Sequence, residues 1–176
     1  MKYLNKFNLS EKNAIIVGGA GLIGKEITIA LSESGANVTV IDINKSPVDE
    51  IIEKYNFSNI SFEKLDLEDI DKLESNFKKI LRNFDKLDIF INCSYPRPKI
   101  QGKKSFDHIE FNYFRKIVDM QLNSFCWLAK MAAQKMKKSK NPGSIVQFSS
   151  IYGVVGQNLN IYENTDMTEN VAYSAI

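Results

Sequence analysis

The chain of 176 residues is long enough to bury one hydrophobic core and too short for two ordinary domains. Its content of 44% hydrophobic and 25% charged residues is typical of a globular protein and argues against intrinsic disorder. The net charge of +2 is close to balanced, so no nucleic-acid partner is expected. Lysines gather at 103–104 and 135–140, and we interpret them as a solvated loop and helix end in preference to a nucleic-acid patch.

The side chains that form disulfides or hold metals are too few and too scattered for either role. The two cysteines, Cys93 and Cys126, provide neither a disulfide framework nor metal-ligand spacing. The single histidine, His108, lies in a polar stretch with no second ligand near it, so we predict a surface position. The first ten residues lack the long apolar run of a signal peptide, and no later segment approaches a membrane span. We therefore expect a cytoplasmic protein with no metal site and no membrane contact.

Short apolar runs alternate with helical patterns along the first half of the chain. The runs predict buried parallel strands, whereas apolar residues spaced by three or four predict helices. Gly35 fits the C-cap of the first helix, and Pro47 suits the first turn of the second. In chain order the sequence predicts a strand over 14–17, a helix over 22–34, a strand over 38–41, a helix over 47–55, a strand over 60–65, a helix over 67–81 and a strand over 87–92.

The second half begins with a loop and a long helix. Two prolines, the first at Pro96, start the loop, and a helical pattern then extends over 113–138 until Asn141-Pro142-Gly143 breaks it. A last strand is predicted over 144–148, and the pattern is loop-like from Ser150 onward.

The alternation of five strands with helices predicts an α/β fold with a doubly wound parallel sheet, right-handed crossovers and helices on both faces. By analogy with the Rossmann fold, we expect the strand order 3-2-1-4-5, with later strands missing, and a ligand crevice between the first and fourth strands. Neither an internal repeat nor a low-complexity linker divides the sequence. We expect residues 1–176 to form a single domain that is incomplete at its C-terminus.

A glycine cluster separates the first predicted strand from the first helix. Gly18, Gly21 and Gly24 permit a tight turn and let the backbone approach a pyrophosphate. The helix that starts at Leu22 and Ile23 supplies free N–H groups and the positive end of its dipole. The alternative interpretation is that the glycines only form a tight strand-to-helix turn and bind no ligand. The place of the cluster between a strand and a helix, with an acidic residue ending the next strand, is typical of dinucleotide binding.

The acidic residue is Asp42, 24 positions after Gly18. Its carboxylate suits the two hydroxyls of an adenosine ribose and would repel a 2′-phosphate. Lys45 is close enough in sequence to soften that repulsion. The sequence therefore favours NAD as the cofactor, with NADP as the alternative.

With this glycine cluster and Asp42, the sequence resembles the short-chain dehydrogenase/reductase family over its whole length. The likeness runs from the glycine turn through Asp66, Asn92 and Ser149–Ser150 to Tyr173. The glycine spacing resembles that of members with extended substrate domains, and the remainder resembles the single-domain members. Three segments are similar to oxidoreductases of bacterial surface-glycan and flagellin-modification loci: 94–97, 149–153 and 161–163.

The resemblance implies further cofactor contacts. Asp66 and Leu67 would lie against the adenine, and Asn92, Cys93 and Ser94 would lie beside the cofactor after the fourth strand. The family motif there is Asn-Asn-Ala-Gly, of which only Asn92 survives. Cys93 has no neighbouring histidine or basic partner that would activate a nucleophilic thiol, so we expect a small buried residue beside the cofactor.

For catalysis the resemblance implies that Ser150 orients the substrate oxygen and that Tyr173 is the general acid or base. A free tyrosine has a pKa of about 10, too high for efficient proton transfer at neutral pH. The family lowers the pKa of that tyrosine with a lysine four residues later, here position 177, and with the cationic nicotinamide. The family's helix asparagine, which holds a water of the proton relay, aligns with Gln121, whereas Asn123 would face another side of the helix.

The segment between the implied serine and tyrosine is longer than is common in the family. Its added residues, within Val154–Asn170, are polar and aromatic. They suggest either an elaborated loop over the pocket of a hydroxyl-rich substrate or a variable surface loop. Tyr152 also lies here, but too close to Ser150 to begin the catalytic helix.

We therefore predict an NAD(P)-dependent oxidoreductase that interconverts a secondary alcohol and a ketone, with a sugar or nucleotide-sugar as its small-molecule substrate. The alternative is a catalytically inactive dinucleotide-binding module with a sensing or scaffolding role, which Gln121 would favour. We expect the chain to be a fragment of a longer enzyme, inactive by itself because the catalytic lysine is absent. The full-length protein is expected to form a homo-oligomer.

Overall fold

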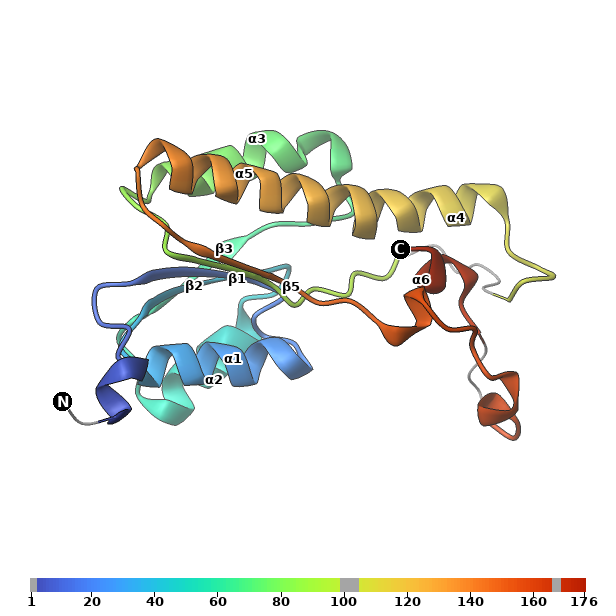
Figure 1. The fold of residues 1–176 in the computed structure, drawn as a ribbon, viewed down its shortest axis with the longest axis horizontal. Coiled ribbons are helices and arrows are strands. Elements are labelled where there is room, and N and C mark those ends of the chain that lie inside the picture. Colours follow the sequence, from blue (N-terminus) through green and yellow to red (C-terminus); the bar gives the residue numbers. More distant parts are fainter. Residues whose placement is uncertain (1–2, 99–104, 166–168) are drawn as a thin grey trace.

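The computed structural model of the chain describes residues 3–98, 105–165 and 169–176. In these residues five parallel strands form one sheet in the order β3-β2-β1-β4-β5, with helices on both faces (Figure 1). The predicted α/β, doubly wound Rossmann architecture is therefore confirmed. The strands are β1 (Asn13–Val17), β2 (Asn37–Asp42), β3 (Ile60–Lys64), β4 (Ile89–Asn92) and β5 (Ser144–Gln147).

The helices that connect the strands form two outer layers. Each returns the chain to the same end of the sheet, which is how neighbouring strands come to run parallel. One layer, below the sheet in Figure 1, consists of α1 (Leu22–Glu33) and α2 (Ser46–Tyr55). The other layer, above the sheet, consists of α3 (Ile70–Arg82) and α5 (Ser124–Lys138).

The central strand β1 is apolar throughout its buried length because both faces of the sheet are covered. Successive side chains point to opposite faces. Ile15 and Val17 join the core that includes Phe77 of α3, while Ala14 and Ile16 join the core on the side of α1 and α2. A run without polar alternation therefore follows from the position of the strand.

The third helix begins later than the sequence prediction placed it. α3 starts at Ile70 rather than at residue 67. The Asp66 carboxylate accepts a hydrogen bond from the Glu68 N–H at 2.8 Å, and this contact holds a turn in front of the helix. Lys116 reinforces the turn by donating to the Glu68 carbonyl at 3.3 Å.

The long helix predicted over 113–138 is interrupted by a change of helix type. α4 (Phe111–Val118) continues into a π-helical turn, η2 (Asp119–Asn123), and then into α5. No glycine or proline marks this turn in the sequence. The Ser124 hydroxyl, fully buried, donates to the Met120 carbonyl at 2.5 Å, a type of side-chain contact that bends helices.

The segment after Ser150, predicted as a loop, contains short helices that polar side chains cap. The capping oxygens belong to Ser150, Asn158 and Asn170. Such local side-chain-to-backbone bonds form short helices without a long apolar pattern, which explains why the pattern looked loop-like. The elements are η3 (Ile151–Gly153), η4 (Leu159–Tyr162) and α6 (Val171–Ala175).

Asp88 connects the amino ends of three strands. Its side chain is only 3% exposed and accepts hydrogen bonds from the Asn13 N–H at 3.0 Å, Lys12 Nζ at 3.1 Å and Asn141 Nδ2 at 3.1 Å. Burial by itself would raise the pKa of Asp88, but these hydrogen bonds and the charge of Lys12 together hold it below its ordinary value.

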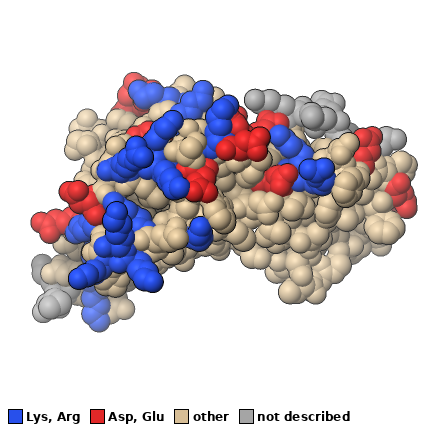
Figure 2. All heavy atoms as spheres, turned by 90° about the horizontal axis from the view of Figure 1, so that it is seen from above, with Lys and Arg blue, Asp and Glu red and all other residues tan. Residues whose placement is uncertain are grey.

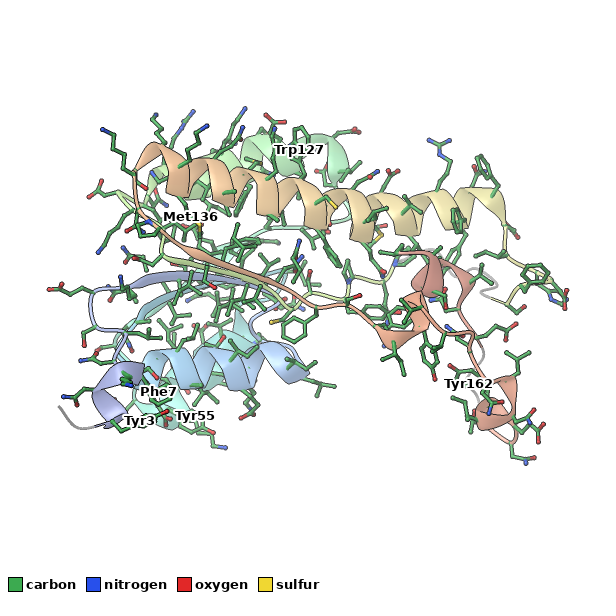
Figure 3. All side chains as sticks on the ribbon, in the orientation of Figure 1. Tyr3, Phe7, Tyr55, Trp127, Met136 and Tyr162 are labelled. Atoms are coloured by element: carbon green, nitrogen blue, oxygen red, sulfur yellow. The ribbon has the colours of Figure 1, made fainter. Side chains whose placement is uncertain are left out.

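The outer face of α3 and α5 combines mixed charge with an exposed tryptophan, Trp127. Acidic side chains lie among the lysines and arginines on the face that α3 and α5 form (Figure 2). On that face Trp127 of α5 donates its indole N–H to Glu74 of α3 at 3.0 Å, and Lys130 lies over its ring at 3.7 Å. Tyr162 lies apart from this face, on the segment after β5 that extends beyond the sheet (Figure 3).

None of the helices in the described ranges combines the length and the apolar character that crossing a membrane requires. Within the same residues, no three histidine, cysteine or acidic side chains gather closely enough to hold a metal ion.

Candidate functional site

A cleft of about 780 Å³ opens at the carboxyl ends of the first four strands. Open parallel sheets bind ligands at this edge. The connection that follows β1 leads to one side of the sheet, and the connection that follows β4 leads to the other side, so a crevice forms between them. Backbone and side chains that follow each of these strands line the cleft: Val17, Gly18, Gly21, Leu22, Ile23, Ile41, Asp42, Ile43, Asn44, Lys64, Leu65, Asp66, Leu67, Glu68, Cys93, Ser94, Tyr95, Pro96, Arg97 and Met120.

The turn between β1 and α1 has room only for glycine at two positions. Gly18 has a φ of +70°, and a Cβ there would lie 2.6 Å from the Ser94 Cα. A Cβ on Gly24 would lie 2.1 Å from the Gly18 carbonyl oxygen. Side chains at these positions would push the turn away from both β4 and the helix, so the glycines allow the close approach of three backbone segments.

The first turn of α1 presents donors and apolar side chains to the cleft. Gly21 precedes the helix, and no side chain of the described residues caps the free N–H groups there. Leu22 is 96% exposed and Ile23 is 57% exposed, although both are apolar. Free N–H groups at the positive end of a helix suit an anionic diphosphate, and a bound ligand would cover the two side chains.

Asp42 lies at the end of β2, two strands away from β4. Its Oδ1 accepts a hydrogen bond from the Ile43 N–H at 2.8 Å, and its Oδ2 accepts one from the Ala20 N–H at 3.4 Å. Lys45, which the sequence left as a possible neighbour, forms an ion pair with Asp49 at 3.3 Å. Lys64, which sequence reasoning missed, pairs with Asp42 in the register of β2 and β3 and lines the cleft.

Asp66 and Leu67 line the same end of the cleft. Asp66 holds the turn before α3, as described above, and therefore has a fixed carboxylate. Leu67 is buried and belongs to the core beneath α3 and α5, so only part of it borders the cleft. Glu68, on the same turn, lies 3.5 Å from Lys116.

The end of β4 is organised by Asn92. Its Oδ1 accepts hydrogen bonds from the Ser94 N–H at 3.1 Å and the Ser94 hydroxyl at 2.6 Å. Its buried Nδ2 has no partner among the described residues, as expected beside a ligand or water site. Burial raises the pKa of the neighbouring Cys93 to about 11, so the thiol stays neutral near pH 7. This favours the view of Cys93 as a small half-buried residue over a nucleophile.

The structure brings the segment of Ser150 together with the helix of Tyr173. η3, which starts directly after Ser150, packs against α6. The Ser150 Oγ accepts a hydrogen bond from the Tyr152 N–H at 3.2 Å, which leaves the hydroxyl hydrogen available to another acceptor. The ring of Tyr173 meets the ring of Tyr95 edge-on at 5.6 Å, and Tyr95 lines the cleft.

The buried amide of Gln121 bonds to the loop that follows β4. Its side chain is 4% exposed, and its Nε2 donates to the Pro96 carbonyl at 3.0 Å. The amide thus holds the loop that follows β4. Asn123 is exposed and donates to the Asp119 carboxylate at 2.7 Å, on another side of the helix.

The loop after β4 contributes residues that sequence reasoning did not assign to the site, Tyr95 and Arg97. The Arg97 guanidinium carbon lies 5.6 Å from the centre of the Tyr95 ring. Burial raises the pKa of Tyr95, and the charge of Arg97 opposes that increase. Their position directly after a strand that ends at the cleft was the signal in the sequence.

Comparisons with known proteins agree with this picture. Residues 12–163 match the family model described as short chain dehydrogenase. The chain is 27% identical over 172 residues to the post-translational flagellin modification protein A of Campylobacter coli, covering 96% of this chain and 66% of that protein. It is 28% identical over 148 residues to the L-rhamnose 1-dehydrogenase (NADP(+)) of Thermoplasma acidophilum, covering 82% of this chain and 57% of that protein.

A solved structure of similar fold is a short-chain type dehydrogenase/reductase from Mycobacterium marinum. The two folds superpose with a TM-score of 0.78 at 21% sequence identity, covering 99% of this chain and 67% of that one. The chain thus spans about two thirds or less of the length of the relatives it matches.

Proposed function

Because the chain belongs to the short-chain dehydrogenase family, we propose that it binds NAD(P) in the cleft and interconverts a secondary alcohol and a ketone. One observation carries the proposal. The glycine turn, which has no room for side chains at Gly18 and Gly24, borders the same cleft as Tyr95, whose ring meets that of Tyr173 at 5.6 Å. A dinucleotide site beside a half-buried tyrosine has the parts that such a reaction requires.

The residues of the cleft fit a dinucleotide. The free N–H groups at Leu22 and Ile23 would bind the diphosphate, and Asp42 would accept hydrogen bonds from the adenosine ribose. Asp66 and Leu67 would border the adenine, and Ser94 would lie toward the nicotinamide. When bound, the cofactor supplies the hydride donor or acceptor.

Tyr173 would exchange the proton with the substrate oxygen. Its ring is half-buried against Tyr95, which limits its motion and its contact with water. The Ser150 hydroxyl would donate to the same oxygen, since its own lone pair is already engaged with the Tyr152 N–H. Gln121 would contribute by holding the loop of Tyr95 in place through the Pro96 carbonyl.

Comparing Tyr173→Phe with Tyr55→Phe tests the proposal. Proton transfer by a positioned side chain contributes about 100- to 10,000-fold, so the first change should lower turnover of keto-sugars and polyols by at least about 100-fold. Dinucleotide affinity, measured by calorimetry, should stay within about twofold. Tyr55, on α2 and stacked on Phe57 away from the cleft, is the matched control. Full activity of the Tyr173 variant would refute the role of Tyr173.

Dinucleotide binding without turnover on any alcohol or ketone, in a protein that includes position 177, would favour the alternative, an inactive dinucleotide-binding module. A sugar-like substrate is proposed because the L-rhamnose dehydrogenase resembles this chain. The polar segment 154–165 near the site is compatible with a hydroxyl-rich ligand. Turnover of acyl thioesters alone would contradict a sugar substrate.

NAD is proposed as the preferred cofactor. The Asp42 carboxylate disfavours a 2′-phosphate, and the ion pair with Asp49 keeps Lys45 engaged. Asp42→Ala should therefore weaken NAD binding by about 10- to 100-fold, the usual range for one lost hydrogen-bonded charge. The same change should strengthen NADP binding, because Lys64 lies on the neighbouring strand. Asp49→Ala is the control, and tighter NADP than NAD binding by the unaltered protein would overturn the preference.

A further inference from the structure

The loop after β4 is held in one conformation by two prolines and one hydrogen bond. Pro96 and Pro98 flank Arg97, and each proline fixes its own φ and restricts the residue before it to extended conformations. The buried amide of Gln121 binds the Pro96 carbonyl at 3.0 Å. The backbone that carries Arg97 is therefore positioned before any ligand arrives.

The Arg97 side chain lies in the cleft, one aromatic ring away from Tyr173. Its guanidinium carbon is 5.6 Å from the centre of the Tyr95 ring, within the range of a cation–π contact. The Tyr95 ring also meets the Tyr173 ring edge-on, with 5.6 Å between the ring centres. A substrate that reaches Tyr173 from the cleft would pass close to this cation.

Arg97 has no carboxylate partner in the part of the chain that the structure describes, where no acidic oxygen lies within 4.0 Å of it. Two basic side chains near the sheet do have partners, Lys12 with Asp88 and Lys116 with Glu68. Arginine is always charged and offers five donors, so a guanidinium left in a cleft can receive an anion from outside.

The two ends of the cleft differ in charge. Asp42 ends β2, and Asp66 and Glu68 follow β3, so three carboxylates and one cation, Lys64, lie at one end. Arg97 follows β4 on the far side of β1. Because neighbouring strands lie about 4.8 Å apart, two strand spacings separate the acidic end from the basic end. The acidic end suits the ribose hydroxyls of a dinucleotide. The basic end is left for a second ligand, and an anionic group on that ligand would be attracted to Arg97.

We propose that Arg97 determines substrate specificity by binding an anionic group, a phosphate or a carboxylate, on the alcohol or ketone substrate. This inference rests on the proposed function. The planar guanidinium would hold two oxygens of the anion side by side and so orient the reacting carbon relative to Tyr173. The cation–π contact with Tyr95 favours this position of the guanidinium before the substrate binds.

The test compares Arg97→Gln with Arg115→Gln. Arg115, exposed on α4, lies 6.0 Å from the Phe111 ring and does not line the cleft, so it is a matched control. Each protein is assayed with a neutral polyol, its phosphate ester and its sugar acid. Loss of one charge-assisted contact should lower kcat/KM for the anionic substrate by about 10- to 100-fold. Activity on the neutral polyol and dinucleotide affinity should stay within about twofold, and Arg115→Gln should change none of these quantities.

The ester and the acid distinguish the two anions, since the substrate that loses more activity in Arg97→Gln identifies the group that Arg97 binds. Equal losses on neutral and anionic substrates, or weaker dinucleotide binding, would overturn the inference. Titration of inorganic phosphate and of acetate into the NAD-loaded protein gives a readout that needs no turnover. Weaker binding of either anion in Arg97→Gln would support the inference even if no substrate reacts, and unchanged binding of both would contradict it.

Discussion

Two regions of the molecule are held by different kinds of contact. In residues 13–92, β1 is buried on both faces, and the glycine turn packs directly against backbone of β4 and α1. In residues 144–176, every residue of β5 is exposed, and the described side chains form no extended apolar core. The predicted cofactor residues lie in the first region, except Cys93 and Ser94, which follow it directly, and Ser150 and Tyr173 lie in the second.

The first region therefore determines the stability of the fold, and the second determines the position of Tyr173. The first region derives its geometry from burial, which makes it rigid and costly to disturb. The second derives its geometry from side-chain-to-backbone hydrogen bonds and one small cluster, in which Ala172 of α6 packs on Tyr113 and Ile117 of α4. Changes in the first region should therefore unfold the protein, whereas changes in the second should misplace Tyr173 without unfolding it.

The largest effect is expected from Gly24→Ala in the glycine turn. The new Cβ would lie 2.1 Å from the Gly18 carbonyl oxygen, so backbone must move. We expect a loss of about 3 kcal/mol in the free energy of unfolding, the upper range for overpacking, and loss of dinucleotide binding. Urea unfolding followed by circular dichroism measures the first effect, and calorimetry measures the second.

Gly156→Ala is the control in the second region. A Cβ there would meet nothing within 4 Å, so the free energy of unfolding should change by less than about 0.5 kcal/mol. If both alanine variants were equally stable, the contrast between the two regions would be wrong.

The next largest effect is expected from Asp88→Asn. The change removes the charge that Lys12, Asn13 and Asn141 share, and hydrogen bonds to charged groups are worth about 2 kcal/mol. The free energy of unfolding at pH 7 should fall by about that amount. Asp85→Asn, in the exposed loop just before, should leave it nearly unchanged.

The effect of Asp88→Asn should depend on pH in a defined direction. The pKa of Asp88 is lower in the folded protein than the value of about 3.9 for an unfolded aspartate. Its stabilising contribution is therefore complete above that value and is lost as the pH falls toward the folded pKa. The gap in stability between the two proteins should narrow below about pH 4, and a gap that widens there would contradict the assignment.

The smallest effect on stability is expected from Gln157→Ala in the second region. Gln157 donates to the Ser174 hydroxyl at 2.8 Å and accepts from the Asn170 N–H at 3.1 Å, and so ties the segment after η3 to α6. Its loss should lower the free energy of unfolding by about 1 kcal/mol. Turnover should fall more clearly than stability, because Tyr173 lies on α6.

Asn158→Ala is the matched control for Gln157→Ala. Asn158 caps η4 through the Asn160 N–H at 3.1 Å and makes no described contact with α6. Turnover should be unchanged in this variant. A loss of stability in Gln157→Ala as large as that in Asp88→Asn would show that the second region is part of the cooperative core.

The same contrast explains how much the sequence could predict. The strands and the glycine turn followed from apolar runs and glycines, because burial on both faces leaves a strong pattern in the sequence. The strand order followed by analogy with the Rossmann fold. The start of α3 did not, because the Asp66 carboxylate competes for the Glu68 N–H and favours a turn. The π-helical turn at Gln121 and the side-chain caps at Ser150 and Asn170 depend on single contacts that no periodicity reveals.

The seam between α3 and α5 contains the only tryptophan of the chain. With the indole N–H of Trp127 on Glu74 and the Lys130 ammonium over its ring, all tryptophan emission arises from one site on the sheet face opposite α1. The protein thus carries its own spectroscopic probe of how α3 and α5 separate. That probe is independent of Ser150, Tyr173 and the glycine turn, none of which contacts the indole.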